Sequence, residues 1–254
     1  MGYYDLSKEE REILKKTIED TVLSDFRTNE HKGILSYSTD DDTYIRKNVY
    51  LAIGRLYKNV PEFRSSIISI LDILFHNTNE KVRQTVVYAL GEIGKIDFDD
   101  TREIFGKALT DGHHSVLNAV TGALKQLGEK NPKPTLEFVK ELLRRSDARA
   151  KEKLLHGLEL RGRTHPEDIL PILFEYQNDP DKKVIKTIVH ILGQISYKKG
   201  CLETVVHSLK KWENRNLIGI ALQEILTVHR SYSRFAHLSF EEAQAYIKKE
   251  FDWE

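Results

Sequence analysis

Residues 82–93 read VRQTVVYALGEI, and four further stretches repeat this pattern in degenerate form. The other copies are IRKNVYLAIGRL at 45–56, VLNAVTGALKQL at 116–127, AKEKLLHGLEL at 150–160 and VIKTIVHILGQI at 184–195. One position of the pattern falls on Ala52, Ala89, Ala123, Gly157 and Ile191, in steps of 37, 34, 34 and 34 residues. A period in the mid-thirties is typical of stacked helical hairpins. We therefore predict an all-α, right-handed α-solenoid of about six hairpins.

The ends of the chain depart from the pattern, as an open stack requires, because a terminal unit must cover an apolar face that has no further neighbour. We expect a single repeat domain over 1–254, with an N-terminal cap at 1–39, repeats at 40–228 and a C-terminal cap helix at 229–254. Both caps contain a capping box, in which a serine and a glutamate three residues later satisfy helix N–H groups: Ser7 with Glu10, and Ser239 with Glu242.

Each repeated helix is followed by a polar connector and then by the second helix of its hairpin. Proline in the connectors supports this division, because its missing N–H does little harm there. Pro171 is expected in the first turn of its helix, where proline is also tolerated. The expected second helices cover 63–75, 101–109, 135–143, 169–176 and 201–209.

Composition limits the classes of function. Lys and Arg number 39 and so do Asp and Glu, so a globally basic nucleic-acid binder is not indicated. Cys201 is the only cysteine, which excludes an intrachain disulfide and favours a reducing compartment. No apolar run approaches the ~20 residues of a membrane span, and the first residues lack a secretory pattern. We therefore expect a cytoplasmic protein without a membrane partner.

The stretch VRQTVVYALGEIGK, from Val82 to Lys95, resembles the HEAT repeat in the version also found in phycobilisome-lyase-type proteins. The same phrase recurs in the other copies, so the resemblance covers roughly residues 40–228. It implies HEAT-like hairpins. Because HEAT arrays mostly act as binding scaffolds, it also implies a non-enzymatic scaffold that holds a macromolecular partner, a protein, on its concave face.

A second resemblance concerns HEAT-like DNA alkylation-repair glycosylases. Residues 42–62 read DTYIRKNVYLAIGRLYKNVPE and residues 129–132 read EKNP, similar to the helix and Asn-Pro turn of those enzymes. His156-Gly-Leu-Glu159 before Thr164-His-Pro-Glu167 is similar to another of their units. The resemblance implies a DNA-binding or DNA-repair lineage as the alternative function.

The functional residues of those glycosylases are not carried over. The positions that match their catalytic aspartate are Arg55 and Gln126, neither of which is a carboxylate. Their groove arginine falls on Glu159, and their groove tryptophans have no match because Trp212 and Trp253 lie elsewhere. No phosphate-binding loop, nucleophile elbow or Cys-x-x-Cys pair is present, so no catalytic residue, cofactor or small-molecule substrate is assigned.

Positions beside the apolar stripe of each repeated helix are expected to line the concave side. Aligning the copies by their common position groups the candidates into three rows. The candidates for partner binding are Lys47, Glu152 and Lys186 in the first row, Tyr88, His156 and His190 in the second, and Arg55, Glu92, Gln126 and Gln194 in the third.

His156 and His190 lie one copy apart, at a helix-packing distance of ~8–10 Å between their Cα atoms. Such a pair could hold a metal with a third ligand such as Glu152 or Glu159. The simpler interpretation, two amphipathic side chains on a ridge, is the one we adopt, and no metal is assigned.

Two further groups leave the choice of partner open. Tyrosine is frequent in the N-terminal third, which indicates ordinary packing or a peptide-binding patch. The tyrosines concerned are Tyr3, Tyr4, Tyr44, Tyr50 and Tyr57. The densest basic cluster, Arg144, Arg145, Arg149 and Lys151, indicates a solvated helix end or contact with nucleic acid. A continuous positive groove and salt-dependent DNA binding would favour the DNA hypothesis, whereas a mixed groove with exposed tyrosines would favour a protein partner.

Overall fold

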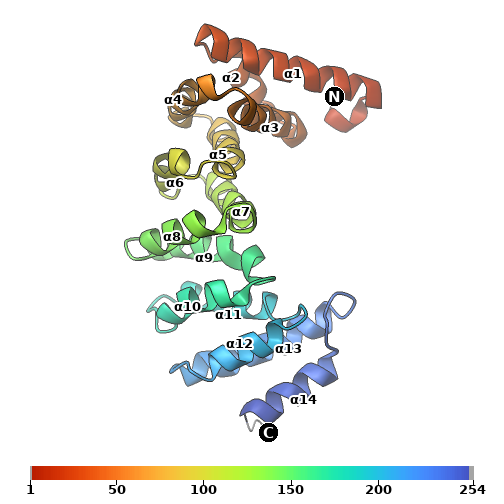
Figure 1. Ribbon diagram of the computed structural model, residues 1–254, viewed down its shortest axis with the longest axis vertical. Helices are drawn as coiled ribbons and strands as arrows, with labels where there is room; N and C mark the ends of the chain where they lie inside the picture. Colours follow the sequence, from red (N-terminus) through yellow and green to blue (C-terminus); the bar gives the residue numbers. More distant parts are fainter. Residues whose placement is uncertain (1, 252–254) are drawn as a thin grey trace. The chain divides into compact units, whose positions relative to one another are not determined.

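The computed structural model describes residues 2–251, so Trp253 lies outside the described residues. Every regular element within this range is a helix, which confirms the predicted all-α class (Figure 1). None of the helices between residues 2 and 251 combines the length and the apolar character needed to cross a membrane. The chain divides after Pro134 into two compact units.

In the N-terminal unit, three copies of the repeat pack side by side. The repeated helices α3, α5 and α7 contact one another in sequence order, and α4 and α6 form the second layer (Figure 1). The helices of this unit are α1 (Lys8–Thr28), α2 (Lys32–Ser38), α3 (Thr43–Asn59), α4 (Arg64–Phe75), α5 (Glu80–Gly94), α6 (Arg102–Ala108) and α7 (His114–Lys130). Single 3₁₀ turns lie at Tyr3–Asp5, Pro61–Phe63 and Asp99–Thr101.

The C-terminal unit repeats this arrangement. Here α9, α11 and α13 pack in sequence order, α10 packs against α9 and α12, and α14 packs against α12 and α13. The remaining helices are α8 (Pro132–Leu143), which begins just before the boundary, α9 (Ala148–Gly162), α10 (Pro166–Glu175), α11 (Lys182–Gln194), α12 (Cys201–Leu209), α13 (Arg215–Ser231) and α14 (Phe240–Phe251).

The repeated helices start at a side chain that accepts a hydrogen bond from a backbone N–H of the first turn. Such a cap satisfies one of the N–H groups that a helix start leaves without a partner. Asp42, for example, accepts from the N–H of Tyr44 at 2.7 Å. The caps of the six repeated helices are Asp42, Asn79, His113, Asp147, Asp181 and Asn214. The period is therefore marked locally by the polar turns.

A basic side chain in the first turn of a repeated helix stabilises the polar turns between copies. Arg46 and Arg83 occupy the same position in successive copies, and each donates to two backbone carbonyls of the turn before its own helix. Arg83 also pairs with Asp111 of the following turn at 2.7 Å. Lys151, two copies later, pairs in the same way with Asp179 at 2.6 Å. These ion pairs join each of these copies to the turn of the next.

The position that defines the repeat lies in the core, as its alignment predicts. Ala89 and Ile191 are fully buried, and Ala52 and Ala123 are nearly so. The close approach of the helices shows at Gly54, where an added Cβ would lie 2.5 Å from the Cβ of Glu92 on α5. Interiors are packed too densely to absorb such an overlap without movement, so small residues set the helix spacing here.

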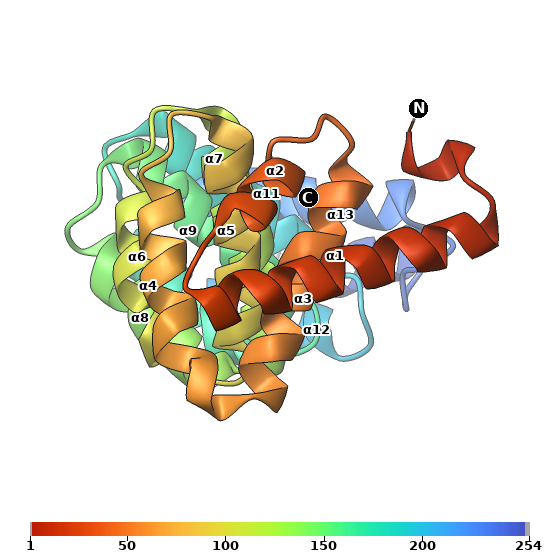
Figure 2. The ribbon, with the colours of Figure 1, turned by 90° about the horizontal axis from the view of Figure 1, so that it is seen from above.

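Both predicted capping boxes are present at the ends of the chain. Glu10 accepts from the N–H of Ser7 at 2.7 Å and donates its own N–H to the Ser7 hydroxyl at 3.2 Å. Ser239 and Glu242 repeat the pair at 2.8 and 3.2 Å. The long helix α1 lies across α3 (Figure 2). The short helix α2 lies between α1 and α3 and contacts both.

Two second helices begin earlier than predicted. Helix α8 starts at Pro132 and α10 starts at Pro166, because proline at the first helical position has its φ preset for the helix and lacks only an N–H that would have no partner there. As a result, the expectation that Pro171 occupies a first turn is wrong. Pro171 lies inside α10, where the carbonyl four residues earlier loses its helical N–H partner.

Candidate functional site

The tyrosine surface consists of Tyr44, Lys47 and Tyr50 on α3 and Gln84 and Tyr88 on α5. These side chains border an open cavity of about 280 Å³ between the two helices. The rings of Tyr50 and Tyr88 contact each other with centroids 5.2 Å apart and planes tilted by 32°. This geometry lies within the range of favourable aromatic pairs. The surface therefore presents a preformed aromatic wall.

The polar groups around this cavity are held in place. Arg46, which lines the cavity from behind, donates to the side-chain oxygen of Gln84 at 3.2 Å. Lys47 is exposed, and among the described residues it has no ion-pair partner. Burial, with smaller contributions from Tyr88 and Glu92, raises the pKa of Tyr50 to about 12. Both rings therefore stay neutral at physiological pH.

A second aromatic cluster extends from Tyr44 toward the N-terminus. The ring of Tyr44 lies 4.5 Å from that of Tyr4 and 6.1 Å from that of Tyr3. Arg11 of α1 lies over the Tyr4 ring at 5.4 Å. In contrast, Tyr57 is fully buried and donates its hydroxyl hydrogen bond to Asp100 at 2.5 Å. Of the two interpretations of the tyrosines, packing holds for Tyr57, whereas the others form an accessible patch.

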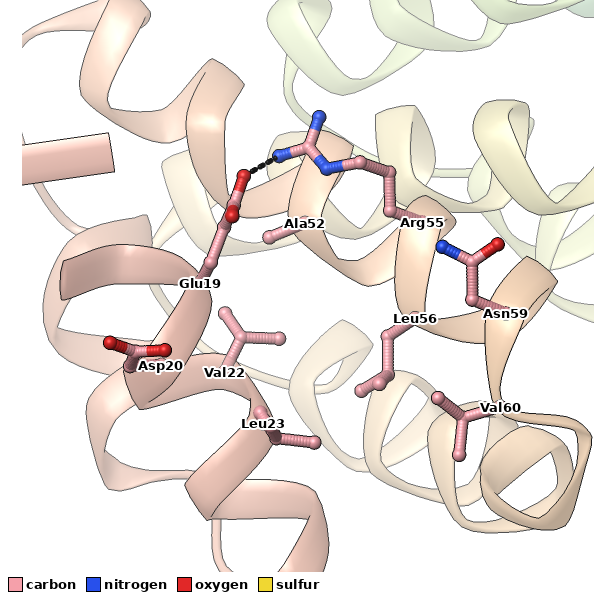
Figure 3. Close-up of a pocket in the computed structure, with 9 residues that line it drawn as sticks. All are labelled: Glu19, Asp20, Val22, Leu23, Ala52, Arg55, Leu56, Asn59 and Val60. Atoms are coloured by element: carbon pink, nitrogen blue, oxygen red, sulfur yellow. Dashed lines mark hydrogen bonds and ion pairs between the residues drawn. The ribbon is translucent and has the colours of Figure 1, made fainter. Parts of the chain in front are cut away.

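Arg55 occupies a separate pocket between the cap helix and α3 (Figure 3). Its guanidinium donates to Glu19 of α1 at 2.5 Å across the mouth of a cavity of about 270 Å³. Val22, Leu23 and Leu56 supply the apolar wall below. The predicted binding role of Arg55 thus competes with an ion pair that ties α1 to the first repeat.

The two candidates that follow along this unit differ in exposure. Glu92 pairs with Lys95 one turn later on the same helix, with 2.6 Å between the carboxylate oxygen and the ammonium nitrogen. Gln126 on α7 is exposed. Neither joins the cavity of the tyrosine surface, so they are flanking positions on the same row of helices.

The histidine site consists of His156 and Glu159 on α9 and His190 on α11. One ligand atom from each of the three side chains lies within 4.8 Å of the others. Oε2 of Glu159 is 3.8 Å from Nδ1 of His156 and 3.9 Å from Nε2 of His190. The side chain of Glu159 is only 6% exposed. The structure thus brings together two histidines of the candidate set and the buried carboxylate that could serve as a third ligand.

A buried carboxylate needs partners, and Glu159 has them on both sides. Its Oε1 accepts from Nη2 of Arg163 at 2.5 Å, and the same nitrogen donates to Gln194 at 2.9 Å. Gln194 is 6% exposed, so it is not part of the accessible face to which its register assigned it. The reason is that Glu159 and Arg163 draw its amide into the helix interface.

The remaining candidates of this unit border the cavity beside the histidine site. Glu152 of α9 and Lys186 of α11 line an open cavity of about 400 Å³ together with His156 and His190. Lys186 is exposed and Glu152 is half-buried. The wall therefore carries both signs of charge next to two imidazoles.

Glu159 also departs from the repeat itself. It stands two residues after the common position, where three other copies carry glycine: Gly54, Gly91 and Gly193. At Gly193 an added Cβ would lie 2.7 Å from a side-chain carbon of Glu224 on α13. This departure from glycine is a sequence signal for Glu159 in addition to its closeness to His156 in the sequence. Tyr50 and Gln84 of the tyrosine surface were not among the selected candidates for partner binding, although Tyr50 is one of the tyrosines for which the sequence left a peptide-binding patch open and Gln84 shares the register of Lys47.

Comparison with known proteins agrees with this architecture. Residues 67–159 match the family model of HEAT repeats. No curated protein matches the chain. AlkD2 of Streptococcus mutans is similar in structure, with a TM-score of 0.55 and 18% identity over 87% of this chain and 100% of that chain. A crescerin structure is similar as well, with a TM-score of 0.51 and 15% identity over 73% of this chain and 85% of that chain. It comes from a TOG domain array described as regulating microtubules in the primary cilium.

A designed armadillo repeat protein for modular peptide recognition reaches a TM-score of 0.40 and 14% identity over 83% of this chain and 99% of that chain. At these identities the similarity to the AlkD2 and crescerin structures concerns the fold alone and leaves the activity to be argued from the site. The chain is a HEAT-like α-solenoid, as its repeats predict.

Proposed function

We propose that this protein is a non-enzymatic scaffold that binds a protein partner at the tyrosine surface of α3 and α5. The observation that carries the proposal is the open cavity bordered by Tyr44, Tyr50 and Tyr88. Tyrosine combines a large apolar ring with a polar tip and loses little conformational entropy on binding, which is why it is frequent at protein interfaces. A preformed cavity also lowers the cost of ordering side chains on association.

The groups at the rim indicate what kind of segment fits. The cavity offers aromatic faces for an apolar side chain, and Lys47 offers an exposed ammonium beside them. An extended segment with an apolar residue next to an acidic one satisfies both features. Burying the apolar residue would supply most of the affinity, whereas the rim charge would mainly favour correct orientation.

DNA binding remains the alternative, and it rests on the resemblance of residues 42–62 to alkylation-repair glycosylases. Against it, cations of the repeated helices already face carboxylates: Arg55 with Glu19, Lys95 with Glu92 and Arg163 with Glu159. Two members of the basic cluster, Arg145 and Lys151, are paired as well. Affinity for DNA comes from neutralising several phosphates, so paired cations favour the protein partner.

A peptide library displayed on phage and selected against the full chain tests the proposal directly. We expect the selected peptides to share an apolar residue flanked by acidic ones, and to bind Tyr50→Ala and Tyr88→Ala at least tenfold more weakly than wild type, in line with the loss of a buried aromatic contact. Tyr232→Ala and Lys58→Ala, on exposed positions outside the surface, serve as matched controls. Equal binding to all five proteins would sink the proposal.

Titration with duplex DNA at several salt concentrations separates the two functions. Each phosphate contact contributes a slope of about −0.9 to a plot of log K against log salt. A slope near zero supports the protein partner. A slope of several units, reduced in the Lys47→Ala variant, would favour DNA as the partner instead of a protein.

The proposal requires no cofactor, and it includes a cytoplasmic location, in keeping with the single, buried thiol of Cys201.

A further inference from the structure

We propose that His156, Glu159 and His190 form a binding site for a divalent transition-metal ion, with Zn²⁺ as the ion that fits best. The inference is independent of the proposed function, because the tyrosine surface belongs to the other compact unit. It starts from the convergence of two imidazoles and one buried carboxylate, whose ligand atoms lie within 4.8 Å of one another.

The donor set suits zinc. Zn²⁺ takes imidazole nitrogen and carboxylate oxygen at about 2.0–2.2 Å, which places the ligand atoms of a tetrahedral site about 3.4 Å apart. The separations from Oε2 of Glu159 to the two imidazole nitrogens, 3.8 and 3.9 Å, are close to this value. Small side-chain rotations of His156 and His190 would close the remaining gap, because their rings are only partly buried.

The surrounding side chains orient the carboxylate for this role. Arg163 holds Oε1 of Glu159 at 2.5 Å, which leaves Oε2 directed toward the histidines. Gln194 accepts from the same guanidinium nitrogen and fixes its position. Ligands oriented by such outer hydrogen bonds bind metals more tightly than unsupported ones.

Glu224 of α13 lies beside the histidine on the opposite side, and a side-chain rotation would bring it within hydrogen-bond distance of the ring. Its Oε1 lies 3.9 Å from Nδ1 of His190, while Nε2 of the same ring faces Glu159. A carboxylate that accepts from one ring nitrogen while the other binds the ion is the usual arrangement of zinc-binding histidines. It also adds a second negative charge beside the imidazole of His190.

Access and the open coordination position come from the adjoining cavity. His156 and His190 line the cavity of about 400 Å³ that they share with Glu152 and Lys186. Three protein ligands leave a fourth position, which water from this cavity would fill. The site therefore has the ligand count, the outer support and the entry path that a metal site requires.

Calorimetric titration of ZnCl₂ into the chelator-treated full chain tests the inference. We expect one ion per chain, and affinity reduced by more than about tenfold in His156→Gln and in His190→Gln, since even outer-sphere changes cost 10–100-fold. Glu224→Gln should lose about 10–100-fold for the same reason. The matched control is His207→Gln, an exposed histidine on α12 of the same unit, which should bind as wild type does.

Cobalt provides a second readout that does not depend on folding energetics. Co²⁺ bound by these ligands should give visible d–d absorption, which should disappear when Zn²⁺ displaces the Co²⁺. The absorption should also be absent in His190→Gln, while the far-ultraviolet circular dichroism of this variant matches that of wild type. The inference is overturned if Zn²⁺ does not bind saturably, or if His156→Gln and His190→Gln bind it as tightly as His207→Gln does.

Discussion

The tyrosine surface and the histidine site are built on the same register of the repeat, yet they have different chemistry. Tyr88 corresponds to His156, and Lys95 and Gln126 correspond to Arg163 and Gln194. Among the differences, Gly91 stands where α9 has Glu159, and Glu92 stands where α9 has Leu160.

With glycine at that position, Lys95 turns to Glu92 on its own helix and Gln126 stays exposed. With Glu159 at that position, Arg163 donates to the carboxylate and also to Gln194, so the three side chains become part of the interface between α9 and α11. The buried carboxylate of Glu159 thus accompanies an ionic cluster between α9 and α11, whereas the corresponding groups of α5 and α7, beside the tyrosine surface, remain at the surface.

The largest expected effect comes from placing a carboxylate where the framework provides no partner. Ala89 is fully buried two residues before Gly91, as Gly157 lies two residues before Glu159. Ala89→Glu buries a charge without compensation and should lower the free energy of unfolding by about 3–5 kcal/mol. Urea denaturation measures the loss. Gln126→Glu, on an exposed position of α7, is the control and should change it by less than about 0.5 kcal/mol.

The next effect tests whether the buried cluster holds α9 and α11 together. Glu159→Gln leaves Arg163, which is 28% exposed, without its charged partner, and should cost about 1–3 kcal/mol in urea denaturation. Glu152→Gln, half-buried on the same helix, should cost little. In a double-mutant cycle with Arg163→Met, the coupling between Glu159 and Arg163 should be at least about 0.5 kcal/mol. Additive effects would show that the pair contributes nothing.

A smaller effect belongs to the aromatic pair of the tyrosine surface. Rings 5.2 Å apart should couple by about 0.5–1.5 kcal/mol in a cycle of Tyr50→Ala and Tyr88→Ala, followed by thermal or urea unfolding. Tyr50 paired with Tyr232, which belongs to the other compact unit, should show a coupling below about 0.5 kcal/mol. A coupling between Tyr50 and Tyr88 no larger than this control would mean that the rings do not hold the arrangement described.

The smallest expected effect is on the titration of the Tyr50 hydroxyl group. Burial raises the pKa of Tyr50 from 10.0 to about 12, so the folded chain keeps this proton after the unfolded chain has lost it. The associated stability is therefore fully present below pH 10 and is lost as the pH rises toward about 12. Tyrosinate absorbance should show a late-titrating group that Tyr50→Phe removes. If this substitution removes only a group with an ordinary pKa, the ring is more hydrated than the cavity geometry indicates.

The sequence was sufficient to predict what is encoded locally. The polar caps Asp42 and Asn79 and the capping box of Ser7 and Glu10 act within one turn of helix, so the predicted helix positions agree with the structure. Pro171 was misplaced because a helix start depends on which of two nearby prolines takes the first position. Pro166 takes it, and the helix then continues through Pro171.

The site was less predictable, because the direction of a long side chain depends on partners from other helices. The repeat register predicts the same accessible position for Gln126 and Gln194. Gln126 is exposed, whereas Gln194 is buried and accepts a hydrogen bond from Arg163. Likewise, nothing in the copy that contains Arg55 reveals that Glu19 of the cap lies within 2.5 Å of its guanidinium. The sequence left the third ligand open between Glu152 and Glu159, and the departure of Glu159 from the glycine of three other copies is the signal that separates the two.

The cations that fasten the turns also constrain how the length of this chain can change. In the pairs Arg83–Asp111 and Lys151–Asp179, the base comes from one copy and the acid from the turn that opens the next. The side chains of Asp111 and Asp179 are 6% and 3% exposed, so either carboxylate would be costly to leave without its base. Both pairs join residues 28 apart in the sequence, so a change of length between base and acid must be absorbed in the intervening connector or second helix if the pair is to persist.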